Sequence, residues 1–565
     1  MTKVVFSSFM GANSRISPDL LPNGFATEAT NVYTDSGSLD TWRDIKDLGT
    51  AWNGKTTVLS SLFLMNNSRW LAWSGARVDV ALSQKASNLD WEVIFTGTDK
   101  PRYTNRLLAI SGGGTNYPEV SFPLGISVPP NPLVAAVGAK TSVAESVKIN
   151  YWVAGTAGDT KGDRIARTYI YTLVNDAGRE GAPSEASNTV YSNDDEQVTL
   201  TVPSIPMPGD IHKIRVYVAS SGGTYNYLKD IALPVTGGSN IITDNKFGDA
   251  IQTTLYSPPP DNMVGITTMA NGMLVGYYGN DLYFSEPWQS HAWPEDYIMA
   301  MDYPIKGLSA YGNMLYISTE GYPVIATGNT PEFMSFTKLG SIQACRSTRS
   351  MVSTGKGAMY AATDGIVFMG GGTAIMASEG LISKRVFHIL NPPSIHAYFY
   401  RGKYVGFYDT GGTGTLTMET GESFPAKGAF VLDGERSTVT FLDVWCDCAY
   451  SDNVSGKLYI VRNIAGYNYM FEFDADTTNL PFSWKTKPII TPKTHFSVCK
   501  IRAERYPFTF QLFTDDNWKY THTVTSDGAF RLPSGYKATK WAVKVYGDSI
   551  IKDITLAESM SELRQ

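Results

Sequence analysis

The sequence predicts an all-β fold, a β-propeller that carries an inserted β-sandwich domain of the fibronectin or immunoglobulin type. The main observation is a phrase that recurs in the second half of the chain: a short apolar strand, a turn built on Gly, Asn or Asp, and a second strand. It occurs at residues 269–278, 308–317 and 352–361, with looser copies at 397–408 and 449–461. A spacing of roughly 40 to 50 residues is typical of one four-stranded propeller blade per repeat.

The composition agrees with a fold made of strands and turns. The chain has 565 residues, of which 12% are aromatic, with 52 Gly and 29 Pro. The net charge of -6 is spread without acidic or basic blocks, which argues against a basic nucleic-acid-binding surface. No apolar run reaches the roughly 18 residues of a membrane helix, and the first residues lack the features of a signal peptide. We therefore expect folding in the cytosol and no stable membrane insertion.

Residues 1–125 are predicted to form an N-terminal arm and the first propeller strands. Residues 18–24 are a turn cluster, and the Ala, Thr and Glu content of residues 25–33 predicts one short helix. Strand candidates follow, enough for one or two blades, at residues 57–64, 70–73, 78–82, 91–95 and 107–110.

Residues 126–260 are predicted to form the inserted β-sandwich. Proline clusters at 128–132 and 257–260 mark its two connections to the rest of the chain. Between them, residues 169–174 and 213–218 alternate between apolar and polar side chains, as half-buried strands do. Because the blade phrase resumes after residue 260, this domain interrupts the propeller.

Residues 261–565 are predicted to supply the remaining blades and to close the ring. Alternating strands continue in the tail at residues 508–513 and 541–546, and residues 556–563 suggest a terminal helical turn. We expect early strands to pair with late strands, since this removes exposed sheet edges.

No catalytic, cofactor-binding or metal-binding residues are predicted, so an enzyme is not expected. The sequence has no Gly-x-Ser-x-Gly motif, and its glycine-rich stretches at 111–115 and 369–373 lack the Lys of a phosphate-binding loop. Cys446 and Cys448 would need partners such as His495 and Cys499 to hold zinc. Buried thiols are the simpler interpretation of these cysteines.

A loop at residues 285–297 is too long and too aromatic for a simple connection. It contains Trp288, Trp293 and Tyr297, and aromatic side chains concentrate at the centres of protein interfaces. Two interpretations stay open: the loop contacts a neighbouring subunit, or its aromatic rings pack beneath a blade.

Three phrases together resemble the tail nozzle family of short-tailed bacteriophages, also called tail tubular protein B. Residues 16–33, with 36–39 and 42–43, are similar to the opening of these proteins, where a Leu-Pro, an Ala-rich turn and a Gly-x-Leu precede a basic residue. Residues 169–184 are similar to a strand and turn of their inserted sandwich, and the loop at 283–294 completes the pattern.

The resemblance implies a structural virion protein located in the tail and assembled in the host cytoplasm. It implies a homo-hexamer that forms the distal nozzle, a conduit and gate for genome DNA, with a tail adaptor ring and tail fibres as further partners. The mildly acidic chain suits this function, since it would bind DNA only weakly and transiently. The resemblance assigns no active-site residues.

Two alternatives stay open: a carbohydrate-binding adhesion propeller and a glycosidase. Propellers that hydrolyse glycans place paired acids at the mouth of the ring. Residues 34–42 loosely match a Ser-x-Asp-x-Gly-x-x-Trp turn, but the Trp is displaced and the phrase occurs once.

Overall fold

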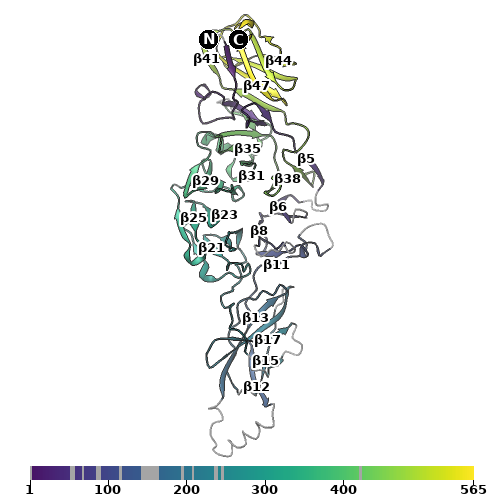
Figure 1. Ribbon diagram of the computed structural model, residues 1–565, viewed down its shortest axis with the longest axis vertical. Coiled ribbons are helices and arrows are strands. Elements are labelled where there is room, and N and C mark those ends of the chain that lie inside the picture. The colour runs from purple at the N-terminus through teal and green to yellow at the C-terminus, as the bar shows by residue number, and fades with distance from the viewer. Residues whose placement is uncertain are drawn as a thin grey trace, which may run out of the picture.

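The predicted all-β propeller is confirmed by the computed structural model. The structure describes residues 3–50, 57–65, 69–83, 91–112, 118–140, 164–192, 196–205, 209–233, 239–242, 247–340, 342–418 and 423–564. Three bodies lie in a row (Figure 1). A body that holds both chain termini is at one end, the propeller is in the middle, and the inserted domain is at the other end.

The propeller consists of six four-stranded modules and one hairpin, counted over the described residues. The hairpin is β6 (Leu59–Met65) and β7 (Arg69–Ser74). The next three modules are β8 (Asp79–Leu82), β9 (Val93–Thr96), β10 (Arg102–Thr104) and β11 (Phe122–Pro123); β19 (Val264–Thr268), β20 (Leu274–Tyr278), β21 (Asp281–Phe284) and β22 (Met299–Ala300); and β23 (Ile305–Tyr311), β24 (Met314–Thr319), β25 (Val324–Thr327) and β26 (Ser335–Lys338). The last three are β27 (Val352–Ser353), β28 (Ala358–Ala361), β29 (Ile366–Gly370) and β30 (Thr373–Met376); β31 (His396–Tyr400), β32 (Lys403–Asp409), β35 (Lys427–Asp433) and β36 (Thr438–Leu442); and β37 (Cys448–Asp452), β38 (Lys457–Ile464), β39 (Tyr467–Glu472) and β5 (Lys46–Thr50).

Each module packs face to face on its neighbours, and a hydrophobic core fills each space between them. One such core holds Leu62 and Val461, which join the hairpin to the β37 module, and another holds Trp73 and Phe95, which join it to the β8 module. The ring is closed by an early strand, because β5 pairs antiparallel with β39. Pairing between an early and a late strand covers sheet edges that an open ring would expose to solvent.

The inserted domain is a sandwich of two antiparallel sheets. One sheet has the order β12 (Val134–Lys140), β15 (Glu196–Thr201), β18 (Ser239–Ile242); the other has the order β14 (Val190–Ser192), β13 (Ile165–Asn175), β16 (Ile211–Ser220), β17 (Asn226–Ala232). Leu200 of one sheet and Tyr171 of the other, both fully buried, belong to the same core. This domain therefore has its own hydrophobic centre.

Residues 482–557 lie outside the ring, which differs from the expectation that 261–565 supply blades and ring closure throughout. They form the terminal body with two early strands, β1 (Lys3–Phe6) and β2 (Ala26–Thr30). Its other strands are β40 (Phe482–Thr486), β41 (Ile489–Thr494), β42 (Val498–Ala503), β43 (Phe508–Thr514), β44 (Asn517–Val524), β45 (Phe530–Arg531), β46 (Ala538–Gly547) and β47 (Ile551–Ala557). Alternation of apolar and polar residues is the same in a blade and in any other half-buried antiparallel strand, so it does not reveal the partner.

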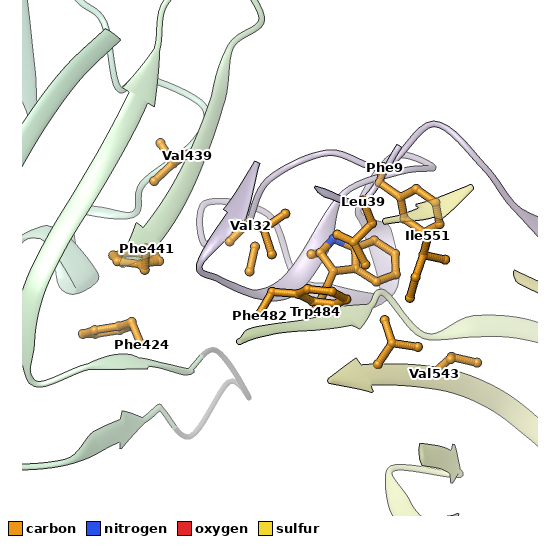
Figure 2. Close-up of a cluster of buried hydrophobic side chains, with 14 of the residues drawn as sticks. Phe9, Val32, Leu39, Phe424, Val439, Phe441, Phe482, Trp484, Val543 and Ile551 are labelled. Atoms are coloured by element: carbon orange, nitrogen blue, oxygen red, sulfur yellow. The ribbon is translucent and has the colours of Figure 1, made fainter. Parts of the chain in front are cut away.

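The terminal body and the propeller share one core. Figure 2 shows the N-terminal segment lying between the C-terminal strands and the end of the β31 module, with Phe9 and Trp484 in contact. The two rings meet edge to face at 4.9 Å, and the Trp484 indole donates to the backbone oxygen of Met10 at 3.1 Å. β2 continues this connection, because it pairs with β36 on one side and with β40 on the other. The two bodies are thus joined by hydrogen bonds as well as by packing.

Three local predictions differ from the structure. The strand candidate at residues 107–110 is a 3-10 helix, η2 (Leu108–Ile110). Residues 25–33 form β2 and the short strand β3 (Val32–Tyr33), which pairs with β4 (Asp40–Thr41), rather than a helix. Residues Ala26 to Ala29 are all buried within the sheet, so tertiary packing overrides their helix propensity. The terminal turn exists but starts later, as a 3-10 helix at Met560–Arg564. The described residues include one α-helix, α2 (Lys384–Ile389), and a further hairpin, β33 (Thr415–Thr417) and β34 (Ser423–Pro425).

Candidate functional site

The three predicted contact residues in the aromatic loop after β21 differ in their exposure to solvent. Trp288 is 48% exposed, whereas Trp293 is only 3% exposed and packs in the core between the β8 and β19 modules. Tyr297 is half-buried, and its hydroxyl donates to Glu286 Oε1 at 3.1 Å. Trp293 thus packs beneath a blade, while Trp288 stays available to a partner.

The same loop holds the inserted domain against the propeller. The ring of His291 places Nε2 3.1 Å from the backbone oxygen of Glu180, and Ser290 Oγ donates to Glu92 Oε1 at 3.2 Å. Glu92 also forms an ion pair with Arg179 of the inserted domain, and both side chains are 14% exposed. The loop is therefore a contact between two bodies of one chain.

A second set of polar contacts completes this joint. Tyr103 on β10 donates its hydroxyl hydrogen to Asp210 Oδ2 at 2.9 Å, and Asn175 Nδ2 donates to the same oxygen at 3.3 Å. Burial raises the pKa of the Asp210 carboxyl above its ordinary value, although these hydrogen bonds oppose the shift. Burial, with the nearby charge of Asp210, also raises the pKa of Tyr103. A buried joint held by hydrogen bonds and an ion pair permits few relative orientations of the two bodies.

A cavity of about 360 Å³ lies where the first strands of several modules converge. Its walls come from β6, β8, β27, β31 and β37, together with the 3-10 helix η5 (Thr348–Ser350) that precedes β27. We call this cavity the funnel. Its volume falls in the range of small-molecule pockets, and its position at the centre of the ring is one that propellers offer to ligands.

Two arginines from different modules reach the funnel. The Arg77 guanidinium pairs with Asp79 and donates to the backbone oxygen of Thr348. Arg349 Nη2 donates to the backbone oxygens of Ser60 at 3.0 Å and Asp447 at 2.9 Å. Isolated arginines carry no motif, so sequence analysis did not identify them.

A neutral histidine lies behind Arg349. His396 Nε2 is 3.1 Å from the backbone oxygen of Cys446, and its ring stacks on Phe407 with 5.4 Å between centroids. Burial, assisted by the positive charge of Arg349, lowers the pKa of His396 to about 3. This ring therefore carries no charge near neutral pH.

The four cysteines are free and buried, as the simpler interpretation of the sequence has it. Burial raises the pKa of each thiol, and that of Cys448 rises to about 12. Within the described ranges, no group of three or more His, Cys, Asp or Glu is arranged to hold a metal ion. In those same ranges no helix is both long enough and apolar enough to cross a membrane.

Comparisons with known proteins show propellers at low similarity. No family model matches the chain, and no curated protein matches it. Among solved structures, it is similar to the Pan2 WD40 domain from Neurospora crassa, with 6% identity, 50% of this chain and 84% of that chain covered, and a TM-score of 0.24. It is also similar to the GH74 xyloglucanase from Xanthomonas campestris, with 10% identity, coverage of 73% and 62%, and a TM-score of 0.26. A third similar structure is the exo-beta-1,3-galactanase from Phanerochaete chrysosporium, with 7% identity, 88% of this chain and 100% of that chain covered, and a TM-score of 0.18.

These matches correct one expectation. The sequence predicts that the chain is not an enzyme. This expectation is contradicted, because two of the three structures named above are glycoside hydrolases. None of the three is a tail protein. At these TM-scores the likeness establishes no activity.

Proposed function

We propose that this chain is a subunit of the nozzle at the distal end of a short bacteriophage tail. The resemblance of residues 16–33, 169–184 and 283–294 to that family suggested this function. The structural observation that supports it is the buried joint, where Tyr103 and Glu92 of the propeller hold Asp210 and Arg179 of the inserted domain. A tube wall must transmit load without bending, and a buried joint held by hydrogen bonds and an ion pair resists bending.

The arrangement of the three bodies suits a subunit of such a wall. The terminal body and the inserted domain lie at opposite ends of the propeller (Figure 1), so one end is available to an adaptor ring and the other to tail fibres or to the exit. Six copies in a cyclic, head-to-tail arrangement would form a closed ring. The funnel, at about 360 Å³, has the size of a small-molecule pocket, so DNA would pass through the opening between the six subunits.

Negative-stain imaging of the purified full chain, alone and mixed with its adaptor ring, tests the proposal. Six-fold rings with the adaptor are the expected result. Particles that remain single chains in the presence of the adaptor would overturn it. The Trp288→Ala variant tests the exposed part of the aromatic loop, and we expect fewer rings from it. Trp518→Ala is the matched control, because Trp518 is also exposed, at 61%, but lies in the terminal body on β44.

A second candidate is a carbohydrate-binding propeller, which the exposed indole of Trp288 favours. Sugar rings pack against flat aromatic faces, and the Trp288 side chain, in the loop that follows β21, is 48% exposed. Glycan-array binding by the single chain, lost in Trp288→Ala and kept in Trp518→Ala, would support this function over the nozzle. Trp293 is not a suitable target, since its burial makes loss of folding the main effect.

A further inference from the structure

The Arg349 guanidinium is fixed in place at the funnel. Its Nη2 donates to two backbone oxygens on different segments, Ser60 on β6 and Asp447 just before β37. The guanidinium also interacts with the hydroxyl of Tyr398, which accepts from the backbone N–H of Ala449 at 2.9 Å. A guanidinium held this way cannot rotate toward solvent without breaking the contacts between modules.

The charge of Arg349 has no carboxylate partner among the residues that the structure describes. The Asp447 carboxylate points elsewhere, because its Oδ2 accepts from the backbone N–H of Asn463 at 2.6 Å. The carboxylate that lines the funnel is Asp79, which already pairs with Arg77. Two guanidinium groups against one carboxylate leave the funnel with one excess positive charge. Withdrawing a charge from water is costly unless an opposite charge accompanies it.

The walls add an apolar surface beside this charge. Phe63 and Tyr450, both half-buried, line the funnel with their rings 5.6 Å apart in an edge-to-face pair. Two of the hydroxyls that line the funnel already bind backbone oxygens: Ser451 Oγ donates to the backbone oxygen of Phe399 at 2.6 Å, and Ser60 Oγ donates to that of Ala76 at 2.8 Å. The funnel is therefore preformed, with one cationic end and an aromatic side.

We propose that the funnel binds a small monoanionic ligand through Arg349, a carboxylate carried on a sugar-sized ring that packs against Tyr450 and Phe63. The cavity of about 360 Å³ accommodates one such ring. A single carboxylate balances the single excess charge, whereas a doubly charged phosphate would be repelled by Asp79. Guanidinium and carboxylate also match in geometry, since both are planar and can form parallel hydrogen bonds. The site does not depend on whether the chain assembles into a ring.

Titration calorimetry on the full chain tests this site with four probes: glucuronate, acetate, inorganic phosphate and glucose. We expect glucuronate to bind most tightly, acetate more weakly, and glucose and phosphate at least about tenfold more weakly than glucuronate, since a charged hydrogen bond contributes about that factor. Glucose that binds as tightly as glucuronate would overturn the assignment of the carboxylate. Phosphate that binds as tightly would overturn the single-charge argument, and no binding of glucuronate would overturn the site.

Variants then locate the site. Arg349→Gln should weaken glucuronate binding about tenfold or more, and Arg346→Gln, at an exposed arginine three positions earlier, should leave it unchanged. Asp79→Asn should act in the opposite direction, tightening glucuronate and admitting phosphate, because it adds one unit of positive charge. If Arg349→Gln fails to fold, Arg349→Lys and Asp79→Asn still decide the question. Equal glucuronate affinity in wild type and Asp79→Asn would overturn the proposal.

Discussion

The hydroxyl of Tyr103, on a propeller strand, donates a hydrogen bond of 2.9 Å to Asp210 Oδ2 of the inserted domain. Asp210 is 4% exposed and Tyr103 is 5% exposed, so this bond lies within the contact between two bodies. It fixes the orientation of the inserted domain together with the ion pair of Arg179 and Glu92. The rigidity of the chain can be tested at these four side chains.

Asp210→Ala should destabilise the joint, because it leaves the Tyr103 hydroxyl buried without its acceptor and removes one of the two acceptors of the Asn175 amide. We expect a loss of about 1 to 3 kcal/mol in unfolding free energy, measured by denaturant titration. Hydrogen exchange should rise at β10 and β16 on the two sides of the joint. Asp210→Asn keeps one acceptor oxygen and should lose less. Equal losses in the two variants would contradict this account of the bond.

The pH dependence of Asp210 has a defined sign. Its folded pKa is raised by burial, so the folded state holds the proton more tightly than the unfolded state. The contribution of Asp210 to stability is thus fully present below the unfolded pKa and is lost as the pH rises through the folded pKa. The unfolding free energy of wild type minus that of Asp210→Asn should therefore fall as the pH rises past the ordinary pKa of an Asp carboxyl. A rise in this difference would show that hydrogen bonding outweighs burial.

The pair of Arg179 and Glu92 should show strong coupling in a double-mutant cycle. Each single Ala variant strands a largely buried charge, and we expect roughly 2 to 4 kcal/mol of lost unfolding free energy from each. The double variant should cost less than the sum, because it removes both charges together. Arg102 and Asp99 form a more exposed pair on the same module and provide the control, with an expected coupling below about 1 kcal/mol. Additive costs for Arg179 and Glu92 would argue against a direct interaction.

Gly272 should not tolerate a side chain, because its Cβ would meet the ring of Trp288 at 2.8 Å and its backbone φ is +82°. Gly272→Ala should lower the melting temperature and shift the fluorescence of Trp288. Gly279→Ala is the matched control, with φ at +60° and no atom within 4 Å, so it measures the backbone strain alone. A difference of about 1 kcal/mol or more between the two variants is expected. Identical effects would mean that the Trp288 ring moves away freely.

The four thiols should be unreactive in the folded chain. All are buried, and burial raises their pKa values, so the nucleophilic thiolate is scarce and inaccessible near neutral pH. Labelling by a thiol reagent should occur at the rate of unfolding and become complete in denaturant. Cys345→Ser is a useful comparison, since its thiol already donates to the backbone oxygen of Ser347 at 3.3 Å. Rapid labelling of the native chain would contradict the burial of at least one thiol.

Much of the fold could be predicted because strand patterns are local. The repeated hairpin phrase at 308–317 became β23 and β24, and the alternation at 169–174 became part of β13. The aromatic loop could also be found from local sequence, since Trp288 and Trp293 lie close together within one connection between strands. Their different roles were not visible, because one indole faces solvent and the other faces the neighbouring module.

The funnel could not have been predicted, because Arg77, Arg349 and Tyr450 belong to three separate modules and share no spacing. The C-terminal residues 482–557 could not be assigned to the terminal body for the same reason, because their packing partners are distant in the sequence. Phe510 and Val543 alternate with polar neighbours as blade residues would, yet they pack with Phe9 and Trp484 in the terminal body.

By itself, the sequence determined that this protein is built of short antiparallel strands, where many of those strands turn, and that a sandwich interrupts the repeats. These properties depend on residues a few positions apart, through backbone geometry and the two-residue period of strands. Only the tertiary structure decided which strands share a sheet, which charges meet in the funnel and how the inserted domain is held. Those outcomes depend on contacts between distant segments, and the chain encodes them through packing and pairing that no local pattern records.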